Sequence, residues 1–449
     1  MKKELALILL SVTSAVVLAL GLIRWLAPEL VGIPADLRLV AIDRAVPPFY
    51  EGVFRKEHLD TSAFQLQDPL TRVRNLPLLP EDLGLGPHDI LGFRNRSVPN
   101  VADVVVIGDS QTYGNNAVLA ENWPSQLETL LSPKNANVYA MAAGGWCGIQ
   151  YADMFLKSVA LRPRVVVVAF YSGNDPLECF SLAYGSPQWE FLRPDGSLSS
   201  DDAPGVVFPS PPELQWKVDF PDGQSTVLTP DLRLASNTDE PAARAGWAIM
   251  EETARRIASA AREFGIAVVF TVIPTKELAY AKRIAAAGLE PRPAYADLVR
   301  SERRNIDAFL AALRNIEGID VVDVTEPLQE ASMQPVPLYP KNENGHPSAS
   351  GYRVIAEAIG PHVLRRLADP IRGLKLLAVG AENVPALVAK EGAWLFTSDQ
   401  SLEANGWKIG DAERVSGLDL QRVPIAGVVR SVNRDRFGPE RNAGNSLSQ

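Results

Sequence analysis

Short, continuous apolar runs alternate with longer amphipathic stretches through the middle of the chain. The first run, residues 101–108 (VADVVVIG), is rich in β-branched side chains, which is typical of a strand buried on both faces of a parallel sheet. Further runs of this kind lie at residues 137–141, 164–170, 266–273 and 319–324, and amphipathic stretches lie at residues 123–131, 149–161, 242–264, 295–316 and 349–367. This alternation predicts βαβ units, a parallel sheet and a three-layer α/β/α domain over residues 101–369.

Three segments interrupt or flank this rhythm. Residues 31–100 are rich in Pro and charge with little periodicity, so we expect a membrane-proximal connector there. Residues 176–240 contain hairpin-like text around a Pro-Asp-Gly turn at 221–223, which predicts an insertion after the third strand. Residues 370–449 hold short alternating runs, which predict a small β appendage with a disordered end.

Residues 1–30 predict a transmembrane anchor or a signal sequence. Two lysines precede an uncharged run over residues 5–23, which as a helix spans roughly 28 Å and is long enough to cross a bilayer. Arg24 and Trp25 close the run, as is typical of a membrane interface. The alternative is cleavage after a small-x-small site at residues 19–21. We expect an extracytoplasmic remainder in either case, on the periplasmic or cell-surface side, and a secreted protein if the segment is cleaved.

Composition narrows the functional classes only a little. With 46% hydrophobic and 22% charged residues the chain is typical of an ordinary folded protein. A net charge of -9 argues against a nucleic-acid partner, because no basic surplus neutralises phosphates. Cys147 and Cys179 are few cysteines for an exported protein of this length. One disulfide and two separate buried thiols both remain open.

The first predicted strand ends in Gly108-Asp109-Ser110. In an open α/β sheet the reactive groups lie at the carboxyl ends of the strands, where the next helix offers backbone N–H donors. Ser110 is therefore a candidate nucleophile. The alternative is that Asp109 or Ser110 only caps the following helix.

The second and third predicted strands end in Gly144-Gly145 and Gly173-Asn174-Asp175. A glycine lets a backbone N–H approach an oxyanion closely, and an Asn side chain adds a directed donor. Oxyanion stabilisation in acyl transfer needs donors of these kinds. If the sheet begins in the common order 2-1-3, Ser110, Gly145 and Asn174 lie on neighbouring strand ends about 5 Å apart.

A fourth candidate follows the fifth strand, in a predicted loop of more than twenty residues at 325–347 with five prolines. Loops of this length in a compact domain are usually functional or disordered. His346 lies at the end of this loop, directly before the last helix. A helix N-terminus disfavours the imidazolium form, which suits a general base.

The residues Gly108-Asp109-Ser110, Gly145, Gly173-Asn174-Asp175 and His346, in this order, resemble the four sequence blocks of the SGNH (GDSL-like) hydrolase superfamily. The resemblance covers about residues 101–368 and implies a flavodoxin-like fold with a five-stranded parallel sheet in the order 2-1-3-4-5. It implies Ser110 as the nucleophile of a serine esterase and His346 as its base. The implied oxyanion hole is the backbone N–H groups of Ser110 and Gly145 with the side chain of Asn174.

One position departs from the family pattern. The family usually has Asp three residues before the His, where this chain has Glu343; some members have the acid two residues before, where this chain has Asn344. Glu343 is therefore the candidate third catalytic residue. A backbone carbonyl is the alternative, and the loss of charge at this place lowers rate.

The expected function is hydrolysis of O-acyl or acetyl esters on cell-envelope glycans or related acyl esters. The chemistry needs no metal and no organic cofactor, and the motifs hold neither a Cys/His ligand cluster nor a G-x-G-x-x-G phosphate turn. Residues 273–277 (IPTKE) are similar to text in members that handle acyl groups on bacterial exopolysaccharides, which suggests polysaccharide machinery as a partner. Two rivals stay open: an O-acyltransferase with the same site, and a catalytically weak glycan-binding or scaffold protein of an envelope assembly.

Overall fold

A computed structural model describes residues 65–68, 71–80, 86–99, 101–134, 136–205 and 210–368, together with short pieces between 375 and 429. The chain divides into two units, residues 1–67 with 74–98 and residues 68–73 with 99–449. The predicted anchor at residues 1–30 lies outside the described residues. Within the described part, no helix combines the length and the apolarity needed to cross a membrane.

The centre of the larger unit is a five-stranded, all-parallel sheet in the order β4-β3-β5-β8-β9. Its strands are β3 (Val104–Gly108), β4 (Val138–Ala142), β5 (Val165–Tyr171), β8 (Ala267–Ile273) and β9 (Asp320–Asp323). In chain order this is 2-1-3-4-5, as predicted. All residues of β3, β5 and β8 are buried, which explains why these strands read as unbroken apolar runs.

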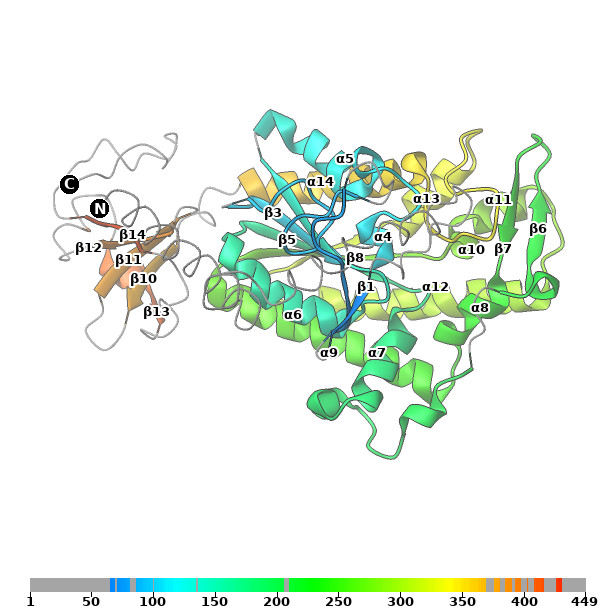
Figure 1. Cartoon of the computed structure of the whole chain (residues 1–449), viewed down its shortest axis with the longest axis horizontal. Coiled ribbons are helices and arrows are strands. Elements are labelled where there is room, and N and C mark those ends of the chain that lie inside the picture. Colours follow the sequence, from blue (N-terminus) through cyan, green and yellow to red (C-terminus); the bar gives the residue numbers. More distant parts are fainter. Residues whose placement is uncertain are drawn as a thin grey trace, which may run out of the picture. The chain divides into compact units, whose positions relative to one another are not determined.

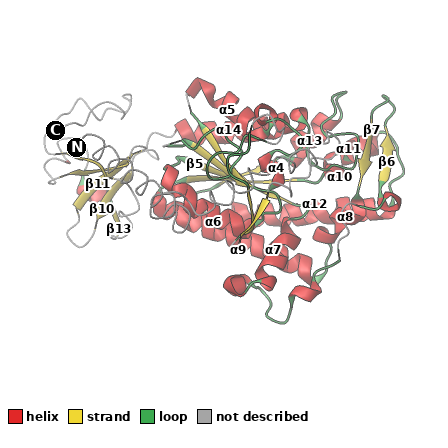
Figure 2. Cartoon of the chain, in the orientation of Figure 1, coloured by secondary structure: helices red, strands yellow, loops and turns green. Residues whose placement is uncertain are grey.

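Helices cover both faces of this sheet, so the domain has three layers (Figure 1). Helices α5 and α14 lie on one face and α6, α9 and α12 on the other, as the colouring by secondary structure also shows (Figure 2). Their bounds are α5 (Trp123–Leu131), α6 (Gly148–Ser158), α9 (Pro241–Phe264), α12 (Pro293–Arg314) and α14 (Ala349–Ala368). The α/β/α architecture follows from the alternation in the sequence.

Short helices follow the carboxyl ends of the strands. They are α4 (Ser110–Tyr113) after β3, α7 (Asp175–Gly185) after β5, α10 (Lys276–Ala279) and α11 (Ala281–Ala286) after β8, and α13 (Thr325–Ser332) after β9. The prediction of a loop over 325–347 is therefore wrong for its first third. Leu328 is buried in the core there, and the prolines that suggested a loop are concentrated further on.

The segment 176–240 is partly regular. After α7 it carries the antiparallel hairpin of β6 (Trp216–Asp219) and β7 (Ser225–Leu228), and then α8 (Pro230–Leu234). Leu228 and Val218 of the hairpin are part of the main hydrophobic core. The hairpin therefore holds α8 at a defined place beside the domain.

Two further parts of the chain lie outside the three-layer domain. Residues 74–98 contain a cis Gly86-Pro87 bond, and in this segment His88 Nδ1 lies 2.6 Å from the carbonyl oxygen of Leu76. Near the C-terminus, five strands form a second sheet in the order β13-β10-β11-β12-β14. The bounds of these strands and of two short strands near residue 70 are β10 (Lys375–Val379), β11 (Val384–Ala389), β12 (Gly392–Phe396), β13 (Glu413–Val415), β14 (Ile425–Val429), β1 (Gln65–Asp68) and β2 (Arg72–Asn75).

Gly246 allows α9 to pack closely against the start of α7. A Cβ atom at this position would lie 1.9 Å from the backbone oxygen of Pro176, so no side chain fits without moving one helix. Asn174 is the N-cap residue of α7. The packing of α9 on α7 therefore sets the position of a candidate site residue.

We expect Gly246→Ala to lower the free energy of unfolding by about 1–3 kcal/mol, because the new methyl group overpacks a backbone contact. Gly185→Ala is the matched control, since a Cβ there meets no atom within 4 Å. The control should leave stability unchanged or raise it by up to about 1 kcal/mol. Urea unfolding followed by circular dichroism measures both, and equal stability of the two variants would contradict the close contact.

Candidate active site

Ser110 is the first residue of α4 and follows β3 through Asp109. The Asp109 carboxylate is the N-cap, with Oδ1 accepting the backbone N–H of Gln111 at 2.9 Å. Helix capping, the alternative role considered for this pair, therefore belongs to Asp109. The Ser110 side chain is only partly buried, and its Oγ lies 2.8 Å from Nε2 of His346.

His346 is held in one tautomer by Asn344. Nδ1 of the ring lies 2.7 Å from Asn344 Oδ1, and the same oxygen accepts the backbone N–H of His346 at 3.0 Å. An amide NH₂ in that place cannot accept the backbone N–H, so the oxygen must face the histidine. Nδ1 therefore carries the proton and Nε2 is free to accept the proton of Ser110.

Asn344, rather than Glu343, occupies the position that orients the histidine. Glu343 is partly buried, and its charge acts on Lys276 instead. The sequence named Glu343 as the first candidate and Asn344 as the place where some family members carry their acid. The geometry supports the second position, with a neutral amide where those members have a carboxylate.

The two predicted oxyanion donors follow the strands on either side of β3. Gly108 is in register with Ala142 of β4 and with Ala169 of β5, so the carboxyl ends of the three strands are neighbours. Gly145 has φ 75°, a conformation that favours glycine, and a Cβ there would meet nothing within 4 Å. Its backbone thus faces open space beside the strand ends.

Asn174 is available as a donor because it does not cap its helix. It is the N-cap residue of α7, yet its side chain makes no capping hydrogen bond and is partly exposed. Asp175, the next residue, is fully buried instead, and its Oδ2 accepts the N–H of Tyr171 and the hydroxyl of Tyr151, both at 2.9 Å. Asp175 thereby fixes the turn that presents Asn174.

The glycine loop after β4 is held from outside the sheet. Trp146 donates its Nε1–H to the backbone oxygen of Val73 at 2.7 Å, and Gln150 donates to that of Thr71 at 3.1 Å. The segment 71–73 thus packs directly on the residues that follow Gly145. The sequence did not predict this contact, because nothing in residues 71–73 marks them as neighbours of the site.

A buried lysine fixes the loop that carries the histidine. Lys276, only 1% exposed, lies at the start of α10, and its Nζ donates to the carbonyl oxygens of Pro340, Asn342 and Asn344 at 2.9, 2.7 and 3.4 Å. Burial lowers its pKa to about 7. Lys276 is therefore a positioning residue for His346, and it belongs to the 273–277 stretch that the sequence singled out for another reason.

The neighbours of Lys276 tie the same region to the core. Glu302 of α12 is buried and accepts hydrogen bonds from Ser172 Oγ at 2.5 Å and from Thr275 N and Oγ1 at 2.8 and 2.6 Å. Glu277 Oε1 accepts the N–H of Thr229, directly before α8, at 2.7 Å. These bonds join β5, α10, α12 and the insertion behind the site. A lone Glu in an amphipathic helix gave no signal for this role.

Electrostatics keep the histidine neutral. Burial, with the charge of Arg233 as a second cause, lowers the pKa of His346 to about 3. Burial raises the pKa of Asp109 to about 7, and it raises the pKa of Asp175 well above its usual range, with the charge of Asp109 adding to the effect. The site therefore combines a neutral His346 with two carboxyl groups, Asp109 and Asp175, that resist ionisation.

The two cysteines lie near these residues as free thiols. Cys147 and Cys179 are both buried and unbridged, so the disulfide alternative is not what the structure shows. Burial raises the pKa of the Cys147 thiol, and a hydrogen bond with Cys179 adds to this. The side chains are therefore adjacent, as expected from their strand ends. Within the described residues, no group of three or more His, Cys, Asp or Glu side chains is placed to hold a metal ion.

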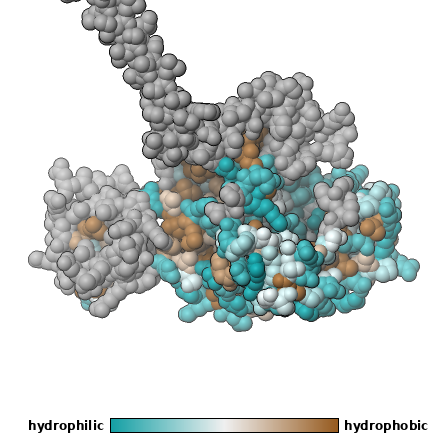
Figure 3. All heavy atoms as spheres, turned by 60° about the horizontal axis from the view of Figure 1, so that its bottom comes forward, coloured by the Kyte–Doolittle hydropathy of each residue, from teal (hydrophilic) through white to brown (hydrophobic). Residues whose placement is uncertain are grey.

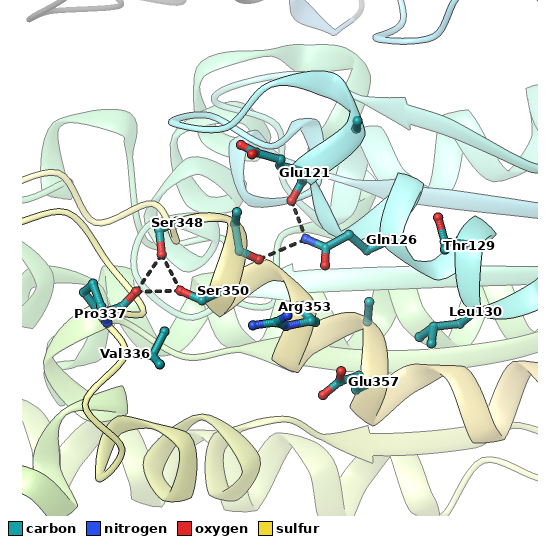
Figure 4. A pocket seen from close by; sticks show the side chains of 13 residues that line it. Glu121, Gln126, Thr129, Leu130, Val336, Pro337, Ser348, Ser350, Arg353 and Glu357 are labelled. Atoms are coloured by element: carbon teal, nitrogen blue, oxygen red, sulfur yellow. Dashed lines mark hydrogen bonds between the residues drawn. The ribbon is translucent and has the colours of Figure 1, made fainter.

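Two hollows of the surface lie away from the Ser110–His346 pair. One, of about 690 Å³, lies between α5 and α14, with Arg353, Glu357 and Gln126 in its wall (Figure 4). In this hollow Gln126 donates to the backbone oxygen of Ala349 at 2.9 Å. The other, of about 250 Å³, is lined by α6 and α9 residues and by Phe191. Hydrophilic and hydrophobic residues are intermixed on the face of the molecule that Figure 3 shows.

A protein-family model supplies the decisive comparison. The model of the GDSL-like lipase/acylhydrolase family matches residues 106–354, which is more than half of the chain. The chain belongs to this family. The match runs from β3 into α14, so it includes Ser110, Gly145, Asn174 and His346.

The chain is also similar to several solved structures at low sequence identity. They include an extracellular lipase from Streptomyces rimosus, 13% identical over 60% of this chain and 100% of that chain, with a TM-score of 0.34. A catalytic mutant of an acetylxylan esterase from Geobacillus stearothermophilus is 11% identical over 60% and 97% of the two chains, with a TM-score of 0.32. A GDSL-like lipase from Bacteroides thetaiotaomicron is 14% identical over 58% and 87%, with a TM-score of 0.29. The comparison with curated proteins gives no match.

We expect Asn344→Ala to lower kcat for an aryl ester by about a hundredfold, because Nδ1 loses its acceptor and the imidazole its orientation. Glu343→Gln should cost much less, since Glu343 does not contact the ring in this geometry. Steady-state hydrolysis of 4-nitrophenyl acetate measures both. A larger loss in Glu343→Gln than in Asn344→Ala would return the orienting role to Glu343.

We expect the imidazole of His346 to stay neutral from about pH 8 down to about pH 5, because its pKa lies near 3. Protonation, and with it the loss of the general base, comes only as the pH falls toward that value. NMR titration of the histidine ring protons checks this, with the signal assigned by its absence in His346→Gln. A midpoint near the ordinary value of 6.5 would contradict the account of the site.

Proposed function

We propose that the protein is a serine esterase that hydrolyses O-acyl esters through Ser110 and His346. One observation carries the proposal: Ser110 Oγ and His346 Nε2 lie 2.8 Å apart while Nδ1 is held at 2.7 Å by Asn344. A nucleophile, a base and a group that orients the base are the parts that covalent acyl transfer needs. Membership of an acylhydrolase family agrees with this chemistry.

The reaction begins when Ser110 Oγ attacks the ester carbonyl carbon and its proton moves to His346 Nε2. The negative charge on the carbonyl oxygen is stabilised by the backbone N–H groups of Ser110 and Gly145 and by the Asn174 amide. His346 then returns the proton to the leaving alkoxide as the C–O bond breaks, which leaves an acyl-serine. A water molecule, deprotonated by His346, releases the carboxylic acid and restores Ser110.

The neutral Asn344 shapes the expected rate. Its oxygen holds the His346 ring in the reactive tautomer, which is the geometric part of the role that the acidic residue has in a catalytic triad. It carries no charge to stabilise the imidazolium that forms in the transition state. The proposed enzyme is therefore slower than one with a carboxylate at this place, unless another charge in the complex compensates.

The proposed substrates are acyl or acetyl esters of cell-envelope glycans, and the proposed place of action is outside the cytoplasm. Support comes from the apolar run at residues 5–23 and from the likeness of residues 273–277 to members acting on exopolysaccharides. In this proposal the N-terminal helix anchors the protein to the membrane, with the polysaccharide machinery of the envelope as partner. An O-acyltransferase uses the same acyl-serine with a sugar hydroxyl in place of water. A scaffold role needs no turnover at all.

Kinetics on the full-length protein in detergent test the proposal. We expect hydrolysis of 4-nitrophenyl acetate by the wild-type protein and a loss of at least about a thousandfold in Ser110→Ala, since the nucleophile acts in every step. Arg255→Gln, at an exposed position of α9, is the control variant and should keep the wild-type rate. Equal rates for the wild-type protein and Ser110→Ala would remove the catalytic assignment.

Product analysis separates hydrolysis from transfer. With an acetyl donor and a neutral glycan acceptor present together, a hydrolase releases acetate in an amount equal to the donor consumed. An acyltransferase leaves part of the acetyl groups on the acceptor. Mass spectrometry of the glycan shows which of the two holds.

A further inference from the structure

Arg233 brings a guanidinium to the histidine side of the site. It belongs to α8 in the insertion, and its Nη2 lies 3.0 Å from the point where a Cβ on Gly345 would stand. Tyr171 Oη lies 3.6 Å from the same point. Because Gly345 directly precedes His346, both polar groups lie close to the loop that carries the base. The absence of a side chain at 345 leaves room for the guanidinium.

Among the described residues, no carboxylate is hydrogen-bonded or ion-paired to the guanidinium of Arg233. Its Nε is shielded from solvent and makes no hydrogen bond, and across the described ranges no hydrogen bond or ion pair to this side chain is found. The guanidinium makes a cation–π contact with the face of the Tyr171 ring, with its carbon 5.8 Å from the ring centroid. Tyr171 Oη is likewise buried without a partner. Donors left unpaired in this way carry a free-energy cost that a bound acceptor removes.

The carboxylates of the region do not fill this role. Asp109, Glu277 and Glu302 act on Arg233 only through space. Each has an oxygen bonded elsewhere: Asp109 to Gln111 N–H, Glu277 Oε1 to Thr229 N–H, and Glu302 to Ser172 and Thr275, while Glu277 Oε2 has no hydrogen-bond partner. Burial also raises the pKa of Asp109 and of Glu302 to about 7, which weakens their charge near neutral pH.

The position of Arg233 indicates which half of an ester it meets. His346 gives its proton to the leaving alkoxide, so the alcohol half of the substrate lies on the histidine side of Ser110. Arg233 lies on this side, next to Gly345, and the residue is partly exposed, so a ligand has access to it. A guanidinium binds carboxylates and phosphates in preference to neutral groups.

We propose that Arg233, with Tyr171 Oη beside it, is an anion subsite for the alcohol half of the substrate, so that the preferred esters carry a carboxylate or phosphate near the acylated hydroxyl. An O-acylated uronic acid is the simplest molecule with this chemistry. The inference rests on the proposed function, which it narrows from acyl esters in general to esters of anionic alcohols.

Binding at this subsite also changes the base. The charge of Arg233 is one of the causes that lower the pKa of His346. An anion on Arg233 offsets that charge, so His346 becomes more basic in the complex and the imidazolium more stable. The bound substrate then supplies part of the negative charge that Asn344 lacks. The preference for anionic esters should therefore appear in kcat as well as in KM.

Calorimetric titration of full-length Ser110→Ala tests the subsite without turnover. The probes are methyl O-acetyl-glucuronoside with a free carboxylate, the matching glucuronamide, and an O-acetyl sugar phosphate. We expect the carboxylate or the phosphate to bind at least about tenfold more tightly than the amide, because the guanidinium gains a charge-assisted pair. Comparing the carboxylate with the phosphate probe shows which of the two anions the subsite prefers. Equal affinity for all three ligands overturns the proposal.

Substitutions assign the preference to Arg233. In the Ser110→Ala background, Arg233→Gln should abolish the difference between the carboxylate and the amide, and Arg233→Lys should keep part of it. Asp231→Asn, an exposed residue of the same helix, is the matched control and should retain the difference. A preference that survives Arg233→Gln overturns the assignment.

Turnover by the wild-type protein distinguishes this inference from the proposed function. The ratio of kcat/KM for the glucuronoside to that for the glucuronamide should be at least about ten, with part of it in kcat. If the anionic ligands bind more tightly but no ester is hydrolysed, the proposed function fails and the subsite stands. If both esters are hydrolysed at equal kcat/KM, the function stands and the subsite fails.

Discussion

The hydrogen-bonded series Asn344–His346–Ser110 is the constraint on which the rest of the site depends. Ser110 belongs to the first strand–helix unit of the sheet and His346 to the last, so they meet only when the whole domain is folded. The sheet order places β3 at the centre of the first three strands, with an oxyanion donor predicted on each side. The histidine must then be brought to Ser110 by a loop without regular structure.

Lys276 compensates for that irregular loop. Its ammonium group bonds to three carbonyl oxygens of residues 340–344, which replaces the backbone bonds that a strand or helix would supply. The cost is a buried cation, seen in its lowered pKa. The same principle recurs at Asp175 and Glu302, which are buried carboxyl groups that accept several hydrogen bonds from turns around the site. The catalytic geometry is thus supported by buried polar residues behind it.

The sequence predicted the parts of the structure that periodicity and strand order control. Continuous apolar runs predicted the five parallel strands. The residues that follow them predicted Ser110, Gly145, Asn174 and His346 as candidates, of which Ser110 and His346 lie 2.8 Å apart. The sequence did not identify Lys276 and Arg233 as site residues. Their roles depend on where a long side chain reaches in the folded chain, and the local sequence pattern does not encode this. The sequence predicted Glu343 as the third residue, whereas Asn344 contacts His346 Nδ1. Positions two and three before His346 are both near enough to reach the ring, and only the conformation of the loop decides between them.

His346 has no carboxylate to orient it, and Arg233 has no carboxylate paired with it in the described part of the chain. The two features are linked, because both leave the site short of negative charge. Asn344 orients His346 but gives it no charge, while Arg233 and burial keep the ring neutral. A site of this kind has low intrinsic basicity, which an anionic substrate can raise on binding. The insertion that carries α8 would then set both the specificity and the reactivity of the Ser110–His346 site.

Peptide mapping after covalent labelling tests the central claim most directly. The full-length protein is treated with a fluorophosphonate, digested, and the modified residue is located by tandem mass spectrometry. The account predicts one phosphonyl adduct on Ser110, formed rapidly in the wild-type protein and at a much lower rate in His346→Ala. Labelling of another serine, or labelling of Ser110 at the same rate without His346, would contradict the assignment of an activated nucleophile.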